Sequence, residues 1–175
     1  MNIVFVMETA LNDMLNECKK HDAESGGILV GVPGYPIIFH AVASGSDAFR
    51  TKAHYIQTPK DTAYLQARLD ALQNGKKDFI GLFHSHPEGI PWPSYSDLEV
   101  TCREKLLDTC YKLKGVIYMV VLERLSKEQS FIPRAFEVSL VNEKISCRNL
   151  PFVVVNNVPG KTQMKEKQAE TVINN

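Results

Sequence analysis

Two histidines, a serine and an aspartate lie within a stretch of fourteen residues near the middle of the chain. His84 and His86 belong to the segment HSHP, and Ser94 and Asp97 belong to the segment PSYSD that follows it. Imidazole and carboxylate groups are ligands that zinc accepts in proteins. Three protein ligands leave one coordination position for water, which is typical of a catalytic rather than a structural zinc site. The residue types and their spacing therefore indicate a catalytic zinc centre.

The strand predicted over residues 78–86 would bring the two histidines to one metal ion. Side chains two positions apart on a strand point to the same side, so His84 and His86 face one ion and Ser85 faces away. Pro87 cannot continue a ladder of backbone hydrogen bonds, so the strand ends where the ligands lie. The candidate site is therefore expected at the end of a strand, where substrate and solvent can enter.

Ser94 and Asp97 have a second interpretation. A helix is predicted over residues 94–112, and a serine followed three residues later by an acidic residue is the pattern of a helix-capping box. Two alternating histidines alone are more typical of surface or packing positions. The close spacing of all four groups favours the metal site, and a capped helix start would also fix Asp97 in place.

The composition excludes several other classes of function. Lys plus Arg and Asp plus Glu each number 20, so the formal net charge is zero and no bulk field attracts nucleic acid or an anionic membrane. No run approaches the roughly 20 apolar residues of a membrane span, and the first residues lack a basic leader segment. We therefore expect a cytoplasmic protein. The four cysteines form no CxxC pair, so a thiolate zinc cage has no support.

The pattern of apolar residues predicts one α/β domain over residues 1–157, with a mixed, mostly antiparallel sheet flanked by helices. A polar tail over residues 158–175 is expected to be disordered. Helices are predicted over 9–21, 59–72 and 94–112, and strands over 3–6, 26–31, 37–43, 78–86, 115–121, 131–138 and 151–155.

These residues resemble the signature of the JAMM metalloproteases, also called MPN+ or Mov34/JAB domains. The motif of that family is H-x-H-x7-S-x2-D, which residues 84–97 fill, with a glutamate well upstream. Here that glutamate matches Glu24, because Glu24, Gly27 and Gly31 fit the family's E-x-x-G-x-x-x-G strand. The likeness covers residues 1–155 and implies the cytidine-deaminase-like fold of compact, prokaryotic stand-alone members.

The resemblance also implies a role for each residue. His84, His86 and Asp97 would hold one zinc ion, with water in the fourth position. Glu24 would take a proton from that water and pass it to the leaving amine, as a general base and acid. Ser94 would donate a hydrogen bond to the oxyanion.

Members of this family cleave bonds after the C-terminal Gly-Gly of ubiquitin-like proteins, and some process sulfur-carrier proteins. A partner with a Gly-Gly tail is therefore expected, and no nucleic acid or membrane; the sequence specifies no oligomeric state. Glycines beside a strand edge would admit the tail as an added strand. Trp92, the only tryptophan, is a candidate wall of the groove, and a packing role is the alternative.

Two other functions share the fold. Some MPN proteins are non-catalytic binding scaffolds, but those have lost motif residues that are all present here. RadC-type proteins carry a similar HxHP and PS-x-x-D segment with a DNA-repair label, and the neutral charge argues against that role.

Overall fold

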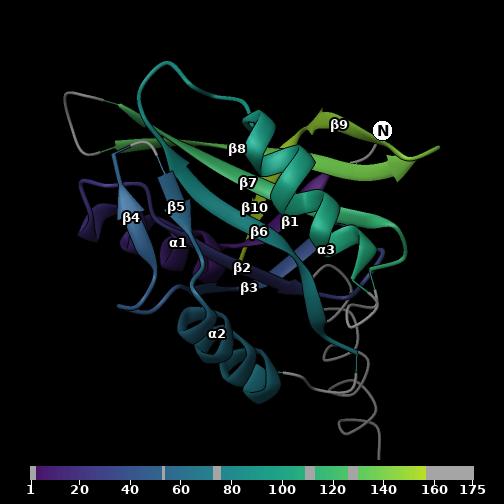
Figure 1. The fold of residues 1–175 in the computed structure, drawn as a ribbon, viewed down its shortest axis with the longest axis horizontal. Coiled ribbons are helices and arrows are strands. Elements are labelled where there is room, and N and C mark those ends of the chain that lie inside the picture. Colours follow the sequence, from purple (N-terminus) through teal and green to yellow (C-terminus); the bar gives the residue numbers. More distant parts are fainter. Residues whose placement is uncertain (1–2, 53, 73–75, 109–112, 126–129, 157–175) are drawn as a thin grey trace, which may run out of the picture.

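The structure, a computed structural model, describes residues 3–52, 54–72, 76–108, 113–125 and 130–156 (Figure 1). The tail over residues 158–175 lies outside the described residues, as does the predicted domain boundary at residue 157. No helix among the described residues is long and apolar enough to cross a membrane.

One eight-stranded sheet forms the centre of the molecule, in the order β10-β1-β3-β2-β6-β7-β8-β9. Four neighbouring pairs are antiparallel, and three are parallel (β1 with β10, β1 with β3, and β6 with β7). The predicted mixed, mostly antiparallel sheet is therefore confirmed. The strands are β1 (Val4–Met7), β2 (Gly26–Gly31), β3 (Ile37–Ala43), β6 (Asp78–His86), β7 (Val116–Leu125), β8 (Ser130–Val141), β9 (Lys144–Leu150) and β10 (Phe152–Val155).

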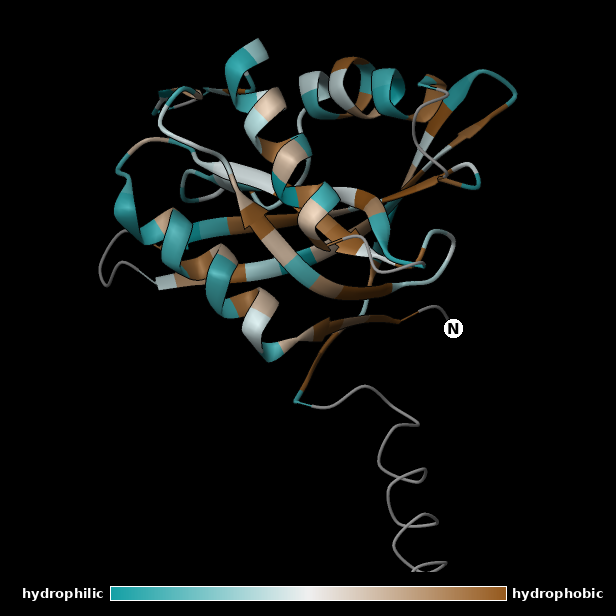
Figure 2. Cartoon of the chain, turned by 90° about the horizontal axis from the view of Figure 1, so that it is seen from below, coloured by the Kyte–Doolittle hydropathy of each residue, from teal (hydrophilic) through white to brown (hydrophobic). Residues whose placement is uncertain are grey.

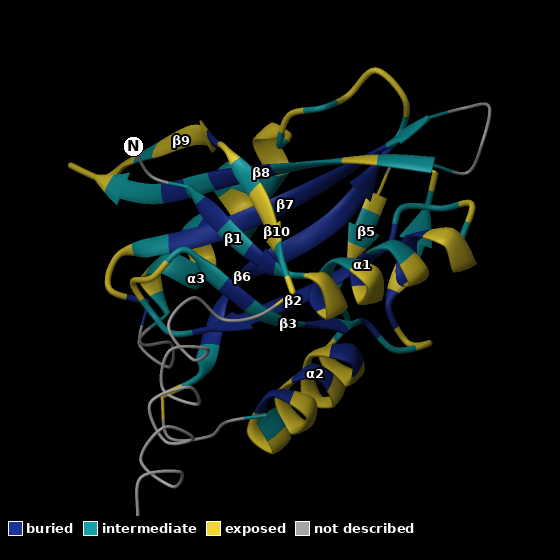
Figure 3. Ribbon diagram, turned by 180° about the vertical axis from the view of Figure 1, so that it is seen from behind, coloured by how far each residue is buried: buried dark blue, intermediate teal, exposed yellow. Residues whose placement is uncertain are grey.

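Helices cover both faces of this sheet (Figures 1 and 3). Helix α1 (Glu8–Lys20) buries Ala10, Met14 and Cys18 in one core with the apolar side chains of one face. Helix α2 (Pro59–Leu72) buries Leu65 and Leu69 in a second core on the opposite face. Apolar residues follow the strands between these layers (Figure 2). The two cores enclose the central strand β6, because all of its residues from Phe79 to His86 are buried.

The segment after the second histidine departs from its predicted single helix over residues 94–112. It begins as a π-helix, η1 (Ser96–Cys102), and continues as α3, which spans only Arg103–Leu107. Asp108 has extended backbone angles (φ −71°, ψ 117°) and ends the helix. Residues 109–112 of the predicted helix lie outside the described residues. π-Helical segments within helices are frequent at functional sites.

A small two-stranded sheet stands apart from the main one. It consists of β4 (Phe49–Thr51) and β5 (His54–Ile56), paired antiparallel. Phe49 and Ile56 pair across the ribbon, and each is just over half exposed. Arg50 and Tyr55 form the next pair along the ribbon, and their side chains face the body of the protein. Neither strand is predicted from the sequence.

Candidate metal centre and active site

The two histidines lie at the end of a central strand of the sheet. Strand β6 pairs with β2 on one side and with β7 on the other, and the pairing with β7 runs to His86. His84 and His86 are only 5% and 4% exposed, and their Nε2 atoms are 2.7 Å apart. As predicted from the alternation of a strand, both rings face one side. Ser85 points to the other side, where it contacts Ser25.

Asp97 reaches the histidines from η1. Its Oδ2 atom lies 3.3 Å from Nε2 of His84 and 3.4 Å from Nε2 of His86. The same oxygen accepts a 2.7 Å hydrogen bond from the backbone N–H of Ser94, and the N–H of Asp97 donates to Ser94 Oγ at 3.2 Å. The capping box therefore forms, and it aims the carboxylate at the histidines.

These three side chains fit a zinc ion. Tetrahedral zinc with bonds of about 2.0–2.1 Å places its ligand atoms about 3.3–3.4 Å apart. The two distances from Asp97 have this value, whereas the two histidine Nε2 atoms, 2.7 Å apart, would have to separate by about 0.6 Å to hold the ion. His86 Nδ1 lies 3.1 Å from the carbonyl oxygen of Ile90. A proton held on Nδ1 by that carbonyl leaves the Nε2 lone pair free for a metal, as is usual for ligating histidines. The cluster is the one group of potential ligands that the described part of the chain brings together in this way.

The charges of the cluster favour a cation at its centre. Burial acts to raise the pKa of Asp97, but hydrogen bonds with His84, His86 and Ser94 outweigh it and hold that pKa well below its usual range. Burial acts to lower the pKa of His86, but the Asp97 carboxylate outweighs it and raises that pKa. In the protein without metal, His86 therefore keeps its second ring proton to a higher pH than a free imidazole does. A metal ion binding there would displace that proton.

Glu24 lies in the segment between α1 and β2, beside the histidine cluster. Its backbone N–H donates a 2.8 Å hydrogen bond to the carbonyl oxygen of Thr51, at the end of β4. The side chain is half-buried, and this burial raises its pKa from 4.5 to about 7, against the opposing charge of His86 and with the support of Asp97. A carboxyl group with a pKa near the working pH is suited to take up and release protons.

Ser94 lies at the start of the turn that carries Asp97. Its Oγ accepts the hydrogen bond from Asp97 N–H, which leaves the hydroxyl proton available for a bond to a substrate oxygen. The structure therefore brings His84, His86, Asp97 and Ser94 into one centre, with Glu24 beside them.

The expectation that glycines would lie beside a strand edge is wrong. Strand β2 lies in the interior of the sheet, between β3 and β6. A Cβ atom on Gly27 would lie 2.0 Å from the carbonyl oxygen of Val42 and 2.8 Å from the ring of Phe83. Gly27 is therefore required by the close approach of β3 and the Phe83 ring, and the edge strands nearest Glu24 are those of the two-stranded β4–β5 ribbon.

Trp92 is both packed and exposed. Its ring lies 5.4 Å from that of the fully buried Phe136, and 58% of the residue remains exposed. Ile90 and Tyr95, which flank it in the loop between the histidines and Asp97, are 47% and 79% exposed. This loop therefore presents an apolar surface beside the histidine cluster.

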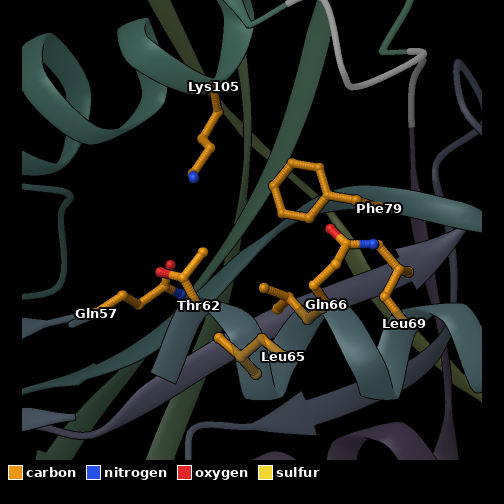
Figure 4. A pocket seen from close by; sticks show the side chains of 8 residues that line it. Gln57, Thr62, Leu65, Gln66, Leu69, Phe79 and Lys105 are labelled. Atoms are coloured by element: carbon orange, nitrogen blue, oxygen red, sulfur yellow. The ribbon is translucent and has the colours of Figure 1, made fainter. Parts of the chain in front are cut away.

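A cavity of about 240 Å³ adjoins the centre at Glu24 and His86. Its lining comes from the segment before β2, from the turn after β4, from the end of β6 and the residues after it, and from β7: Asp22, Ala23, Glu24, Lys52, Ser85, His86, Pro87, Glu88 and Arg124. A second hollow, between α2 and α3, is far smaller, at about 10 Å³, and is lined mostly by apolar and amide side chains such as Leu65, Gln66 and Phe79 (Figure 4). It has room for about one water molecule, so of these two only the larger cavity can accept part of a substrate.

Several residues that support the centre carry no signal in the sequence. Glu123 on β7 is buried and accepts a 3.0 Å hydrogen bond from the N–H of Gly89, which anchors the loop after the histidines. Ser25 and Ser85 bond to each other through main-chain and hydroxyl groups. Serine and glutamate are common at protein surfaces, so these residue types alone indicate no role. For Ser25 and Ser85, the one signal in the sequence is their position next to motif residues.

Comparisons with known proteins agree with this geometry. The model of the family described as prokaryotic homologs of the JAB domain matches residues 9–135. The chain is also similar to the solution structure of protein DSY2949 from Desulfitobacterium hafniense, at 15% sequence identity and a TM-score of 0.57. That match covers 91% of this chain and 97% of the other, and it shows a shared fold. No curated protein sequence matches this chain.

Proposed function

Because the chain belongs to the family of prokaryotic homologs of the JAB domain, we propose that it is a zinc-dependent peptidase or isopeptidase. Its substrate is a ubiquitin-like or sulfur-carrier protein, and it hydrolyses the bond that follows the C-terminal Gly-Gly of that protein. The reaction either removes a conjugated group or processes a precursor in the cytoplasm.

One observation carries this proposal. Oδ2 of Asp97 lies 3.3 Å and 3.4 Å from the two histidine Nε2 atoms, as two ligands of one zinc ion would, and Glu24, whose pKa is raised to about 7, lies beside them. A binding scaffold would need neither the convergence nor the perturbed carboxyl group. Both are features of a hydrolytic centre.

The roles of the side chains follow from their places. Zinc, when bound by His84, His86 and Asp97, lowers the pKa of a water molecule to about 7 and polarises the scissile carbonyl. Glu24 accepts a proton from the attacking water and delivers it to the leaving nitrogen. Ser94 donates its hydroxyl hydrogen bond to the carbonyl oxygen as the carbon becomes tetrahedral.

The two sides of the scissile bond can be assigned from the same roles. The nitrogen that receives the proton must lie next to Glu24, and the carbonyl oxygen must lie next to Ser94. The 240 Å³ cavity is lined by Glu24 and His86. We therefore place the leaving amine and the residues attached to it in this cavity. Its rim carries charges of both signs, on Asp22, Lys52, Glu88 and Arg124.

The Gly-Gly tail would then need a second binding surface. Both strands of the two-stranded β4–β5 ribbon are edge strands, and an extended tail could add to one of them. Trp92 and its exposed neighbours Ile90 and Tyr95 offer an apolar surface for the folded part of the partner.

The test is cleavage of a small ubiquitin-like protein fused through Gly-Gly to a reporter peptide, with zinc-loaded protein. Mass spectrometry of the products should show a new C-terminus at the second glycine. A fusion with Ala-Ala in place of Gly-Gly serves as the matched control and should be cleaved at least about tenfold more slowly, because its methyl groups add bulk in a narrow groove. Equal cleavage of both fusions, or of neither, would contradict the proposed substrate.

A further inference from the structure

A buried carboxylate that takes no part in this chemistry lies behind the active centre. Glu17, on the last turn of α1, is 3% exposed. Its Oε1 atom accepts hydrogen bonds from Ser25 Oγ at 2.8 Å and from Arg50 Nη2 at 3.2 Å. The His21 ring lies 3.3 Å from the same oxygen, and Lys20 Nζ lies 3.6 Å from Oε2. Burial of a charge is costly unless the charge is paired and hydrogen-bonded, and Glu17 is both.

The first of these contacts leads to the histidine strand. Ser25 follows Glu24 in the chain, and Ser85 separates the two histidines. The N–H of Ser25 donates to Ser85 Oγ at 3.0 Å, and the N–H of Ser85 donates to the carbonyl oxygen of Ser25 at 2.8 Å. Ser25 therefore connects the Glu17 carboxylate to the strand that carries the metal ligands.

The second contact leads to the β4–β5 ribbon. The side chain of Arg50 is only 10% exposed. Besides Glu17, its guanidinium donates to the carbonyl oxygens of Ser44 at 3.2 Å, Gly45 at 2.9 Å and Ala48 at 3.2 Å. The next residue, Thr51, accepts the hydrogen bond from Glu24 N–H. Arg50 therefore fixes the strand end to which the Glu24 backbone is bound.

Glu24 needs such anchors because it belongs to no helix or strand. Its backbone is held on one side by Thr51 and on the other through its neighbour Ser25, and both anchors meet at the Glu17–Arg50 pair. A general base must stay within hydrogen-bond reach of the water, and a displacement of about 1 Å can cost about 100-fold in rate.

We propose that the buried Glu17–Arg50 ion pair positions Glu24 against the histidine strand, which makes Glu17 and Arg50 positioning residues for the hydrolysis. The expected fall in kcat rests on the proposed function. The rigidity that the pair confers on residues 24, 25 and 85 can be measured without any turnover.

The central variant is Glu17→Gln, which keeps an oxygen acceptor for Ser25 and removes the charge that holds Arg50. We expect kcat on the Gly-Gly fusion to fall about 10- to 100-fold, with KM within about twofold and one zinc still bound per chain. Glu137→Gln is the matched control, because it breaks an Arg–Glu pair on β8 and β9 (Arg148 Nη2 to Glu137 Oε1, 2.7 Å) in another part of the fold. Its kcat should equal that of the parent protein.

Ser25→Ala supplies a gentler variant if Glu17→Gln fails to fold. It removes the hydroxyl contacts to Glu17 and to Arg50 Nε (3.5 Å), and it leaves the main-chain bonds to Ser85 and the Glu17–Arg50 pair itself. Its kcat should fall less than that of Glu17→Gln. A loss of zinc, or a rise in KM that matches the fall in kcat, would show general damage to the fold and overturn the positioning role.

Amide hydrogen exchange measured by NMR separates this idea from the proposed function. In Glu17→Gln, the amides of Glu24 and Ser85 should exchange at least about tenfold faster, while amides of β8 and the midpoint of unfolding change little. Unchanged protection of both amides would overturn the inference, even if the protein hydrolyses the fusion. Faster exchange in a protein that cleaves nothing would support the inference and count against the proposed function.

Discussion

Ser94 and Asp97 donate backbone hydrogen bonds to each other's side chains, at 2.7 Å from Ser94 N–H to Asp97 Oδ2 and at 3.2 Å from Asp97 N–H to Ser94 Oγ. The oxygen that caps the turn is the oxygen that faces both histidines. From the sequence, helix capping and metal binding are alternative roles for Asp97. In the structure, one carboxylate oxygen is placed for both roles.

Replacement of Asp97 by asparagine separates these two roles. The amide oxygen of the new side chain can still accept the hydrogen bond from Ser94 N–H, but a neutral amide is a poor zinc ligand. We expect Asp97→Asn to lower zinc affinity by at least about 100-fold. Loss of a residue that only hydrogen-bonds to a metal ligand typically lowers metal affinity by about 10- to 100-fold, so a larger loss identifies Asp97 as a ligand. Competition with a chromophoric chelator measures this. Glu99→Gln on the same element is the control, and equal zinc affinity of Asp97→Asn and the parent would exclude Asp97 as a ligand.

Ser94 can be tested with a substitution that spares the cap. Glycine replaces a serine cap at a cost of only a few tenths of a kcal/mol, whereas alanine costs about 1 kcal/mol. Ser94→Gly should therefore unfold at nearly the parental temperature and still lose about 10²–10³ in kcat, because the oxyanion donor is gone. Steady-state kinetics and thermal unfolding give both quantities. A Ser94→Gly protein with parental kcat would rule out the donor role.

The raised pKa of Glu24 has a consequence for the stability of the metal-free protein. Between its ordinary value of 4.5 and its folded value of about 7, the unfolded state has lost a proton that the folded state keeps. The free energy of unfolding therefore falls as the pH rises through this window. Glu24→Gln lacks this contribution, so its unfolding midpoint should decline less from about pH 5 to pH 8. Parallel pH profiles for the two proteins would contradict the raised pKa.

Gly27 is expected to tolerate no side chain. A Cβ atom there would lie 2.0 Å from the carbonyl oxygen of Val42. Gly27→Ala should therefore lower the free energy of unfolding by about 1–3 kcal/mol. Gly45→Ala is the matched control, because its nearest neighbour would lie at an ordinary 3.4 Å, and its effect should stay within about 0.5 kcal/mol. Chemical denaturation measures both, and equal effects would show that crowding at β2 is not the cause.

Long segments with a clear apolar pattern could be predicted from the sequence. The strands over residues 26–31, 37–43 and 78–86 are confirmed at both ends, because glycine, proline or polar residues bound each apolar run. The capping box of Ser94 and Asp97 also forms as its spacing predicts.

Elements that depend on distant partners could not be predicted. Strands β4 and β5 have three residues each, too few to show a period, and they are held in place by Arg50 and Tyr55 through contacts with other segments. Strand β9 is mostly exposed and polar, and it forms only because β8 offers an edge. Glu17 is a further example, since its pairing with Arg50 joins residues that are 33 positions apart.

Hydrolysis at this centre requires that zinc held by His84, His86 and Asp97 act together with Glu24 as the base. Zinc content and cleavage of the Gly-Gly fusion, determined on the same preparations of the parent protein and of Glu24→Gln, test this requirement. We expect one zinc per chain in both proteins, and a fall of at least about 100-fold in kcat for Glu24→Gln. Equal kcat in the two zinc-loaded proteins, or a parent protein that binds no zinc at neutral pH, would refute the mechanism.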